Sequence, residues 1–365
     1  MKQLSLKLSE QKASLTRQSI YAVIHSKKEG TRKKESAKKY YAIDWADAKN
    51  AVLKKHHVIL EPEIDRFKLH HDGQYYWDVA YDGTVMYADT LAVSVSGGRT
   101  SGYMAFLLKQ KYGHLPMVFN FANTGWEHEK TLEFVAFCDK EFDLNLNWLE
   151  AVFVDYDKPL SFRLVDYKTA SRKGEPFEAM VKRFGLPNQS FKHCSRETKR
   201  YVMARYLKST GKARHMSAIG IRADEWGRIA EDQSDSNCCY PLIDLDVNKA
   251  EVFDFWTRQK YDLEIPTAFG NCLGCHKKSE RKLRYVAHAL PEAFDVALML
   301  QEKYETHIPE KQAKRRHSNN FMYRGYRSPQ WFLDNAIEAP ATDDRESWLE
   351  DLYGDESDCE SCEAY

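Results

Sequence analysis

Short apolar runs alternate with amphipathic stretches through the middle of the chain. The apolar runs cover residues 91–95, 117–121, 148–154 and 215–221, and helical periodicity follows the first two over 101–110 and 129–142. Strand followed by helix, repeated along one stretch of chain, is typical of a parallel sheet joined by right-handed helical crossovers. The pattern therefore predicts an α/β fold in which helices cover both faces of a parallel sheet.

The regions on either side of this pattern differ from it. Residues 1–55 are polar with helical spacing, and the runs 75–81 and 85–87 enclose the turn signal Asp82-Gly83, which predicts a β-hairpin. We therefore expect three regions, namely a basic helical extension that ends in the hairpin (1–87), the α/β domain (88–290), and a helical region with an acidic tail (291–365).

The composition is that of a folded protein. Of the 365 residues, 43% are apolar and 13% aromatic, which is enough for a substantial core. The chain has no run of about 18 apolar residues that could span a membrane, and its N-terminus lacks the apolar stretch of a secretory signal. We therefore expect a cytoplasmic protein without a membrane partner.

The net charge of zero hides a gradient along the chain. Residues 1–60 hold 14 basic and 5 acidic side chains, whereas residues 334–365 hold 1 basic and 12 acidic ones. A second basic stretch, 311–331, places Phe321, Tyr323 and Trp331 among arginines. Basic and aromatic side chains together suit nucleic acid, so both basic segments are candidates for such contact. A solvated basic surface is the alternative.

A glycine pair follows the first apolar strand, in Ser96-Gly97-Gly98-Arg99-Thr100-Ser101. The glycines permit a tight turn with accessible N–H groups, and a helix begins at Thr100 or Ser101. Because open α/β sheets bind ligands at the carboxyl ends of their strands, this segment predicts a pyrophosphate-binding loop. It matches neither the dinucleotide pattern G-x-G-x-x-G nor the P-loop of kinases. A plain turn between strand and helix is the alternative.

The eight cysteines stand at positions 138, 194, 238, 239, 272, 275, 359 and 362. Cys138 lies in an apolar helical stretch, and we expect it in the core. The two-residue gap between Cys272 and Cys275 lets both sulfurs reach one metal centre, with Cys194 and Cys239 as candidates for the remaining ligands. Basic neighbours stabilise thiolates and an anionic cluster, which favours an iron–sulfur cluster, with zinc as the second candidate.

These segments together are similar to the phosphoadenosine phosphosulfate (PAPS) reductase family of PP-loop nucleotide α-hydrolases, which includes phage and mobile-element members. The matches are 96–101 (SGGRTS), 123–131 (NTGWEHEKT), 193–199 (HCSRETK), 220–225 (GIRADE), 240–242 (YPL) and 270–275 (GNCLGC). They cover roughly residues 88–288. The resemblance implies a Rossmann-like fold of the HUP type, in which nucleotide is bound at the glycine pair.

The resemblance also implies roles for individual residues. The phosphates of ATP or PAPS would be held by Ser96, Gly97, Gly98, Arg99, Thr100 and Ser101, with Thr124 and Gly125 beside the nucleotide. The candidate catalytic residues are Glu127, Arg222 and Cys194, and the candidate ligands of a 4Fe–4S cluster are Cys194, Cys272, Cys275 and Cys239. Glu127 would hold a metal or polarise the attacking group, or else cap a helix. The common loop of the family has Lys and Asp where this one has Arg99 and Thr100, so an acidic contact to Mg²⁺ is missing there.

Three functions remain open. The first is an ATP-dependent sulfur-transfer enzyme that adenylates an acceptor in DNA or transfer RNA and releases pyrophosphate. The acceptor would then receive sulfur via the cysteine-ligated iron–sulfur cluster, with a sulfur donor such as cysteine desulfurase as a partner. The second is a PAPS or adenosine phosphosulfate reductase that releases sulfite and uses a thioredoxin-like reductant. The tail carries Cys359 and Cys362 but lacks the Gly-x-His ending of such reductases, which argues against this function. The third is a non-catalytic nucleotide-binding module of a phage or defence complex. A homo-oligomer is expected.

Overall fold

The computed structural model describes most of the chain from Thr90 onward and separate strands before it. The backbone alone is described for 20–24, 36–40, 59–62, 67–69, 75–81 and 84–88, and the main part comprises 90–113, 116–154, 158–213, 215–228, 238–310 and 321–338. The cysteines of the acidic tail and residues 311–320 of the second basic stretch lie outside the described residues. Their proposed roles stay predictions.

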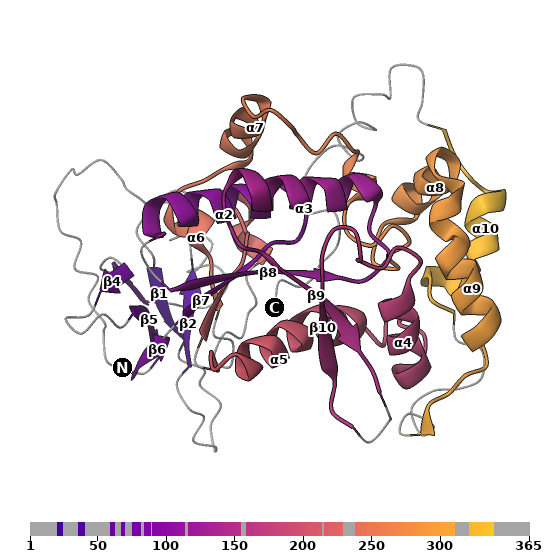
Figure 1. Cartoon of the computed structure of the whole chain (residues 1–365), viewed down its shortest axis with the longest axis horizontal. Helices are drawn as coiled ribbons and strands as arrows, with labels where there is room; N and C mark the ends of the chain where they lie inside the picture. Colours follow the sequence, from indigo (N-terminus) through magenta and orange to yellow (C-terminus); the bar gives the residue numbers. More distant parts are fainter. Residues whose placement is uncertain are drawn as a thin grey trace.

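A six-stranded sheet forms the centre of the described structure (Figure 1). Every neighbouring pair of strands is parallel except β9 with β10. In spatial order the strands are β10 (Ser161–Val165), β9 (Asn147–Val152), β8 (Met117–Asn123), β7 (Thr90–Ser94), β11 (His215–Ala218) and β12 (Cys238–Cys239). This arrangement confirms the predicted α/β, Rossmann-like fold.

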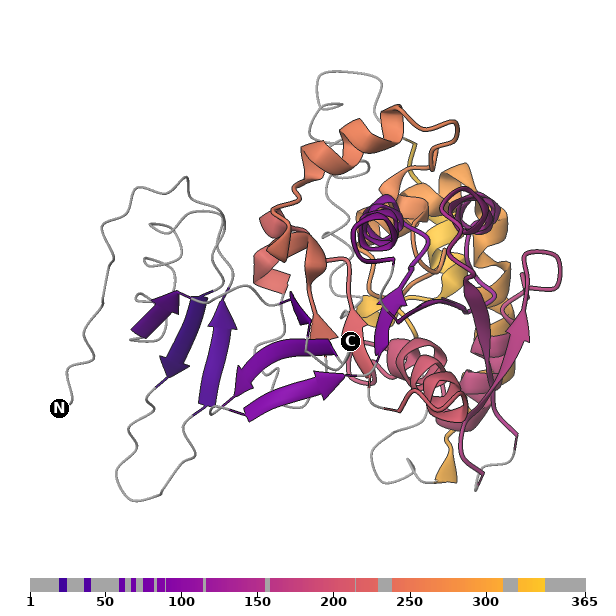
Figure 2. The same cartoon turned by 60° about the vertical axis from the view of Figure 1, so that its left-hand side comes forward.

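Helices cover both faces of the sheet, as predicted (Figure 2). Helices α2 (Arg99–Tyr112) and α3 (Glu129–Glu141) lie on one face, where α7 (Lys249–Thr257) packs on them through Phe134 and Trp256, whose rings are 4.6 Å apart. Helix α5 (Tyr201–Ser209) covers the other face and buries Leu207 against Ala92 and Val118. Burial on both faces explains why β7 and β8 are almost continuously apolar.

Further helices surround one end of this sheet (Figure 1). They are α4 (Glu175–Phe184), α8 (Glu280–Ala289), α9 (Asp295–Tyr304) and α10 (Pro329–Asp334), with the short η4 (Pro291–Phe294) before α9. The remaining short helices are η1 (Arg196–Arg200, a π-helix), η2 (Ala223–Arg228), α6 (Pro241–Asp244), η3 (Thr267–Phe269) and η6 (Arg324–Tyr326). In the described part of the chain, no helix is both long and apolar enough to cross a membrane.

The strands described within the first 88 residues form two small antiparallel sheets, in the orders β2-β1-β3 and β4-β5-β6. The hairpin of β5 (Tyr75–Tyr81) and β6 (Thr84–Ala88) is confirmed. The helical prediction for residues 1–55 is wrong where the backbone is described, because β1 (Ile20–Ile24) and β2 (Ser36–Tyr40) are strands. The β-branched and aromatic run of β1 favours a strand. The other strands are β3 (Ile59–Pro62) and β4 (Phe67–Leu69).

The order of strands reverses at β7. The chain passes from β7 to β8 and β9 in one direction, and β11 and β12 then continue the sheet on the other side of β7. Ligands of open α/β sheets bind beyond the carboxyl ends of the strands at such a reversal. The segment that leaves β7 at this point is the glycine pair with its flanking serines.

Candidate functional site

The glycine loop, residues 95–101, turns sharply from β7 into α2. Val95 donates its backbone N–H to the carbonyl of Asn120, which ties the loop to β8. Gly97 has a φ of 88°, and a Cβ on it would lie 2.5 Å from Cγ2 of Thr131. Position 97 therefore requires glycine on two independent grounds, backbone conformation and space.

Hydroxyl groups close the bend from inside. Ser101 Oγ accepts the backbone N–H of Ser96 at 3.0 Å and donates to the carbonyl of Gly98 at 3.0 Å. The Ser96 hydroxyl lies 2.9 Å from the same oxygen, and Ser96 is exposed at the rim. The N-cap of α2 is Gly98, which supplies no side-chain cap, and the first turn has no acidic residue. This N-terminus therefore keeps its partial positive charge for an anion.

The two arginines predicted at this site lie beside the loop, and acidic residues balance both of them. Arg99 makes a bidentate ion pair with Asp262, at 2.7 and 2.9 Å, and also donates to the carbonyl of Leu263. Arg222 is 3% exposed, contacts Asp224 and Glu225, and donates to the hydroxyl of Thr100 at 3.3 Å. Both guanidinium groups hold the loop in position, and a direct contact with phosphate remains a prediction.

The Thr124 turn, residues 123–127, leaves β8 next to the glycine loop. Glu127 accepts the backbone N–H and the hydroxyl of Thr124, at 3.1 and 2.8 Å, and the backbone N–H of Trp126 at 3.1 Å. Gly125 has a φ of 78°, and a Cβ there would lie 2.8 Å from Pro176. The buried carboxylate of Glu127 thus supports the turn, and the predicted catalytic role is not needed to explain its placement.

Glu150 on β9 fixes the same turn from behind and was missed in the sequence. Its carboxylate is fully buried and accepts from Asn123 Nδ2 at 2.6 Å, from the backbone N–H of Ser171 at 2.6 Å, and from Arg163 at 2.8 Å. Asn123 in turn accepts the backbone N–H of Gly125 at 3.1 Å. The pairing of residues 27 positions apart carries no local sequence signal.

The cysteine loop, residues 270–275, lies directly on the Thr124 turn. Leu273 donates its N–H to the carbonyl of Trp126 at 2.8 Å, and Cys272 pairs with Glu127 in an isolated β-bridge. The Cys272 sulfur lies 3.3 Å from the hydroxyl of Thr124. The backbone at Gly274 passes so close to the Trp126 ring that a Cβ would approach it to 2.2 Å. The predicted pair of thiols therefore sits at the carboxyl end of β8.

The other predicted ligands, Cys194 and Cys239, come from other segments of the chain. Cys194 is buried just before η1, and its segment reaches the cysteine loop through Gln189, which donates to the carbonyl of His276 at 2.9 Å. Cys239 lies on β12, three strands from β8, which corresponds to about 14 Å at ~4.8 Å per strand. Joint ligation of a metal centre by Cys239 and Cys272 stays a prediction.

Within the described ranges, no three His, Cys, Asp or Glu side chains are gathered as a metal ion requires. The iron–sulfur and zinc assignments therefore stay predictions. Cys138, by contrast, is confirmed as a core residue, and its burial raises the pKa of its thiol strongly.

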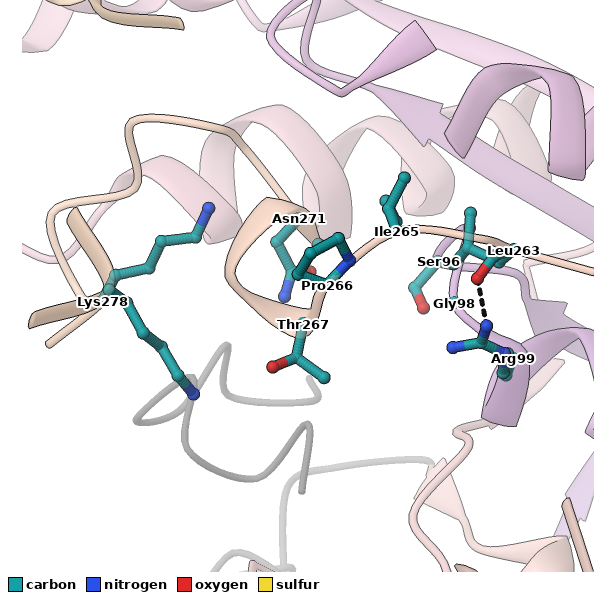
Figure 3. Close-up of a pocket in the computed structure, with 12 residues that line it drawn as sticks. Ser96, Gly98, Arg99, Leu263, Ile265, Pro266, Thr267, Asn271 and Lys278 are labelled. Carbon is teal, nitrogen blue, oxygen red and sulfur yellow. Dashed lines mark hydrogen bonds between the residues drawn. The ribbon is translucent and has the colours of Figure 1, made fainter. Parts of the chain in front are cut away.

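A cleft of about 590 Å³, part of it open solvent, lies between the glycine loop and the segment that carries the cysteine loop (Figure 3). Figure 3 shows Ser96 and Arg99 at one end and Lys278 at the other. The lining residues are Ser96, Gly97, Gly98, Arg99, Leu263, Ile265, Pro266, Thr267, Gly270, Asn271, Lys278 and Lys282. Residues 263–271 and Lys282 were not among the predicted site residues. The sequence does contain one signal for Lys282. It stands three residues after the helix N-cap Ser279, at a position where helices commonly have Glu.

His128 links the Thr124 turn to the wall of the cleft. It is the N-cap of α3, and its Nδ1 accepts the backbone N–H of Lys130 at 3.0 Å. The ring stacks on Phe269 with centroids 5.6 Å apart, and burial lowers its pKa. The accepting nitrogen and the lowered pKa both indicate a neutral imidazole.

The fold and the glycine loop together define an α/β protein with a candidate anion site at the reversal of strand order. A scan against models of known protein families finds no match for the chain. A search of curated proteins finds similarity to the "uncharacterized nin region protein ORF290" of Escherichia phage lambda, with 29% identity over 287 residues. The match covers 75% of this chain and 94% of the phage lambda protein.

Proposed function

We propose that this chain is an ATP-binding enzyme that transfers an adenylyl group, with the phosphates held by the glycine loop. The supporting observation is the position of that loop, which leaves the central strand β7 where the strand order reverses and lines a cleft. The resemblance of its sequence to the PP-loop of the PAPS reductase-like family supports the same ligand.

The proposed reaction transfers the adenylyl group to an acceptor in nucleic acid. The acceptor oxygen attacks the α-phosphorus, the bond from that phosphorus to the bridging oxygen breaks, and pyrophosphate leaves with the electron pair while the acceptor proton passes to water. The N-terminus of α2 would stabilise the negative charge on the phosphates. Sulfur delivery rests on the resemblance alone. Since two thiols in one loop do not complete a metal centre, we derive no step through a cluster.

The first test uses calorimetry to measure the ATP affinity of a Gly97→Ala variant. The added methyl group meets Thr131 in a backbone conformation that disfavours it, so the loop must shift, and we expect ATP affinity to fall at least about tenfold. Ser96→Ala, which leaves the backbone free, should weaken binding less. Gly211→Ala is the matched control, because Gly211 also has a positive φ of 77° and nothing lies within 4 Å of its Cβ position. It precedes β11, at the amino end of the parallel strands, whereas the glycine loop lies at their carboxyl end.

Equal ATP affinity in Gly97→Ala and Gly211→Ala, or no ATP binding by the unmodified chain, would contradict the proposal. The reaction is tested by pyrophosphate release from ATP in the presence of DNA or transfer RNA. Release of sulfite from PAPS with a thiol reductant would support the reductase instead.

A further inference from the structure

Helix α5 lies on the face of the sheet opposite α2 and α3 (Figure 1), and the segment that contains it is strongly basic. Residues 189–213 hold seven basic side chains and a single acidic one, Glu197. Glu197 is 5% exposed and pairs with Arg196 at 2.9 Å. The segment therefore has a large net positive charge of its own, and its one carboxylate is buried.

The exposed residues of α5 lie along one side of the helix. The opposite side buries Val202 and Leu207 against the sheet. Tyr201, Arg205 and Lys208 are spaced by four and three residues, so they share the outer side, and all three are exposed. Within the described part of the chain, neither Arg205 nor Lys208 takes part in an ion pair. Both cations are therefore accessible to an anion in solution.

A π-helical turn extends this row beyond the start of α5. Tyr201 donates its backbone N–H to the carbonyl of Arg196, five residues earlier, so Arg196 lies one turn before Tyr201. The guanidinium groups of Arg196 and Arg200 lie 5.8 and 5.6 Å from the centre of the Tyr201 ring. Such contacts hold flexible cationic side chains in place. We call Arg196, Arg200, Tyr201, Arg205 and Lys208 the basic stripe.

The basic stripe begins at the end of the sheet where the candidate site lies. Val202 packs against Ala151 near the carboxyl end of β9, whereas Leu207 packs against Val118 near the amino end of β8. The segment before the stripe also reaches the residue after the cysteine loop, through Gln189. At 1.5 Å per residue the stripe is about 18 Å long, which equals about five base pairs of duplex at 3.4 Å each.

We propose that the basic stripe binds the phosphate backbone of a nucleic acid and directs the acceptor toward the glycine loop. Cations along one side of a helix are the typical footprint of a surface for a long polyanion. The inference adds to the proposed function the surface that holds its acceptor, and in that role it rests on the proposed function. Because the stripe offers groups for phosphates, it should bind nucleic acid without regard to sequence.

A membrane surface fits the stripe less well. A helix that binds lipid inserts its apolar side among the acyl chains. The apolar side of α5 is buried against the sheet through Val202 and Leu207. On the outer side, Tyr201 is the only large apolar side chain of the stripe. Charge without an apolar anchor favours nucleic acid.

The test measures binding of a labelled DNA duplex and of transfer RNA to the full chain by fluorescence anisotropy over a range of salt concentrations. Arg205→Gln and Lys208→Gln should each lower DNA affinity several-fold. Each should also reduce the slope of log affinity against log salt by about 0.9, the value for one phosphate contact on duplex DNA. ATP affinity, measured by calorimetry, should stay within about twofold, because neither side chain lines the cleft. The nucleic acid with the larger loss identifies the preferred backbone.

Lys140→Gln is the matched control. Lys140, like Lys208, is an exposed lysine in the last turn of its helix, but its helix α3 lies on the other face of the sheet. This variant removes the same charge and should leave affinity and slope unchanged. Tyr201→Ala keeps both arginine charges and removes the ring that holds them, so affinity should fall while the slope stays the same. Tyr201→Phe keeps the ring and should bind as the unmodified chain does.

The outcomes separate the stripe from the proposed function. Unchanged affinity and slope in both stripe Gln variants, or an equal loss in Lys140→Gln, would overturn the stripe. If those variants lose affinity for vesicles that contain phosphatidylserine but keep their affinity for DNA and transfer RNA, the surface serves a membrane and the proposal is wrong. Absence of any nucleic-acid binding by the unmodified chain would overturn the stripe and the nucleic-acid acceptor together, while ATP binding at the glycine loop survives. DNA binding through the stripe without ATP binding would overturn the proposed enzyme and leave the stripe as a nucleic-acid surface.

Discussion

The glycine loop and the Thr124 turn follow the carboxyl ends of two neighbouring central strands, but their polar groups are used in different ways. In the Thr124 turn, a buried carboxylate accepts the backbone N–H groups of Thr124 and Trp126. In the glycine loop, Ser101 closes the bend, whereas α2 begins without any side-chain cap. One segment satisfies its donors internally and the other leaves helix N–H groups for a ligand.

This difference separates structural acids from binding groups at one site. Glu127 and Glu150 are both buried near the carboxyl ends of the central strands, and both accept hydrogen bonds that hold the Thr124 turn in place. The group that remains for a ligand is the glycine loop with the N-terminus of α2, which has no side-chain cap. Substitutions should therefore affect stability in the first set and affinity in the second.

The largest effect is expected for Glu150→Ala. The change leaves Asn123 and the backbone N–H of Ser171 without their buried acceptor, and removing one partner from such a network destabilises by about 3–5 kcal/mol. Urea denaturation would measure it. Glu141→Ala is the matched control, since Glu141 pairs with an exposed Lys260 and should contribute less than about 1 kcal/mol. Similar losses for both variants would contradict the supporting role of Glu150.

A smaller effect is expected for Glu127→Gln, which distinguishes support of the turn from catalysis. The amide keeps one acceptor oxygen and turns an N–H₂ group toward the donors of Thr124 or Trp126, so stability should fall by about 1–3 kcal/mol. ATP affinity should stay within about threefold. A variant of unchanged stability that binds ATP normally but releases no pyrophosphate would instead make Glu127 a catalytic residue.

Local patterns predicted the central strands and the glycine loop because the relevant physics is local there. β7 and β8 are buried on both faces and read as apolar runs, and Gly97 stands where the backbone needs a positive φ. Strand β10 was missed because all of its side chains are partly or fully exposed. Strand β1 was mistaken for helix although its β-branched and aromatic run favours a strand.

The cleft could not be predicted from the sequence, because it is formed by contacts between residues that are far apart in the chain. Arg99 forms an ion pair with Asp262 across 163 positions, and the sequence pattern did not predict this contact. Lysines usually lie at the surface, so the burial of Lys278 and Lys282 could not be read from composition. Of the predicted cysteine ligands, only Cys272 and Cys275 are close in sequence, so theirs is the only proximity that the spacing of the cysteines could predict.

The smallest expected effect is a pH dependence of stability that originates at His128, beside the Thr124 turn. Burial lowers the pKa of its imidazole in the folded chain, so the unfolded chain binds the proton more readily. Stability from the neutral ring is therefore complete above the usual pKa of about 6.5, decreases as the pH falls below it, and is lost below the folded pKa. His128→Asn keeps an N-cap acceptor but does not titrate. The midpoint temperature of thermal unfolding, measured from about pH 7, above the usual His pKa of about 6.5, down to about pH 5, should therefore depend less on pH in the variant than in the unmodified chain. An equal pH dependence in both proteins would show that the Thr124 turn and the stacked Phe269 do not keep this ring neutral.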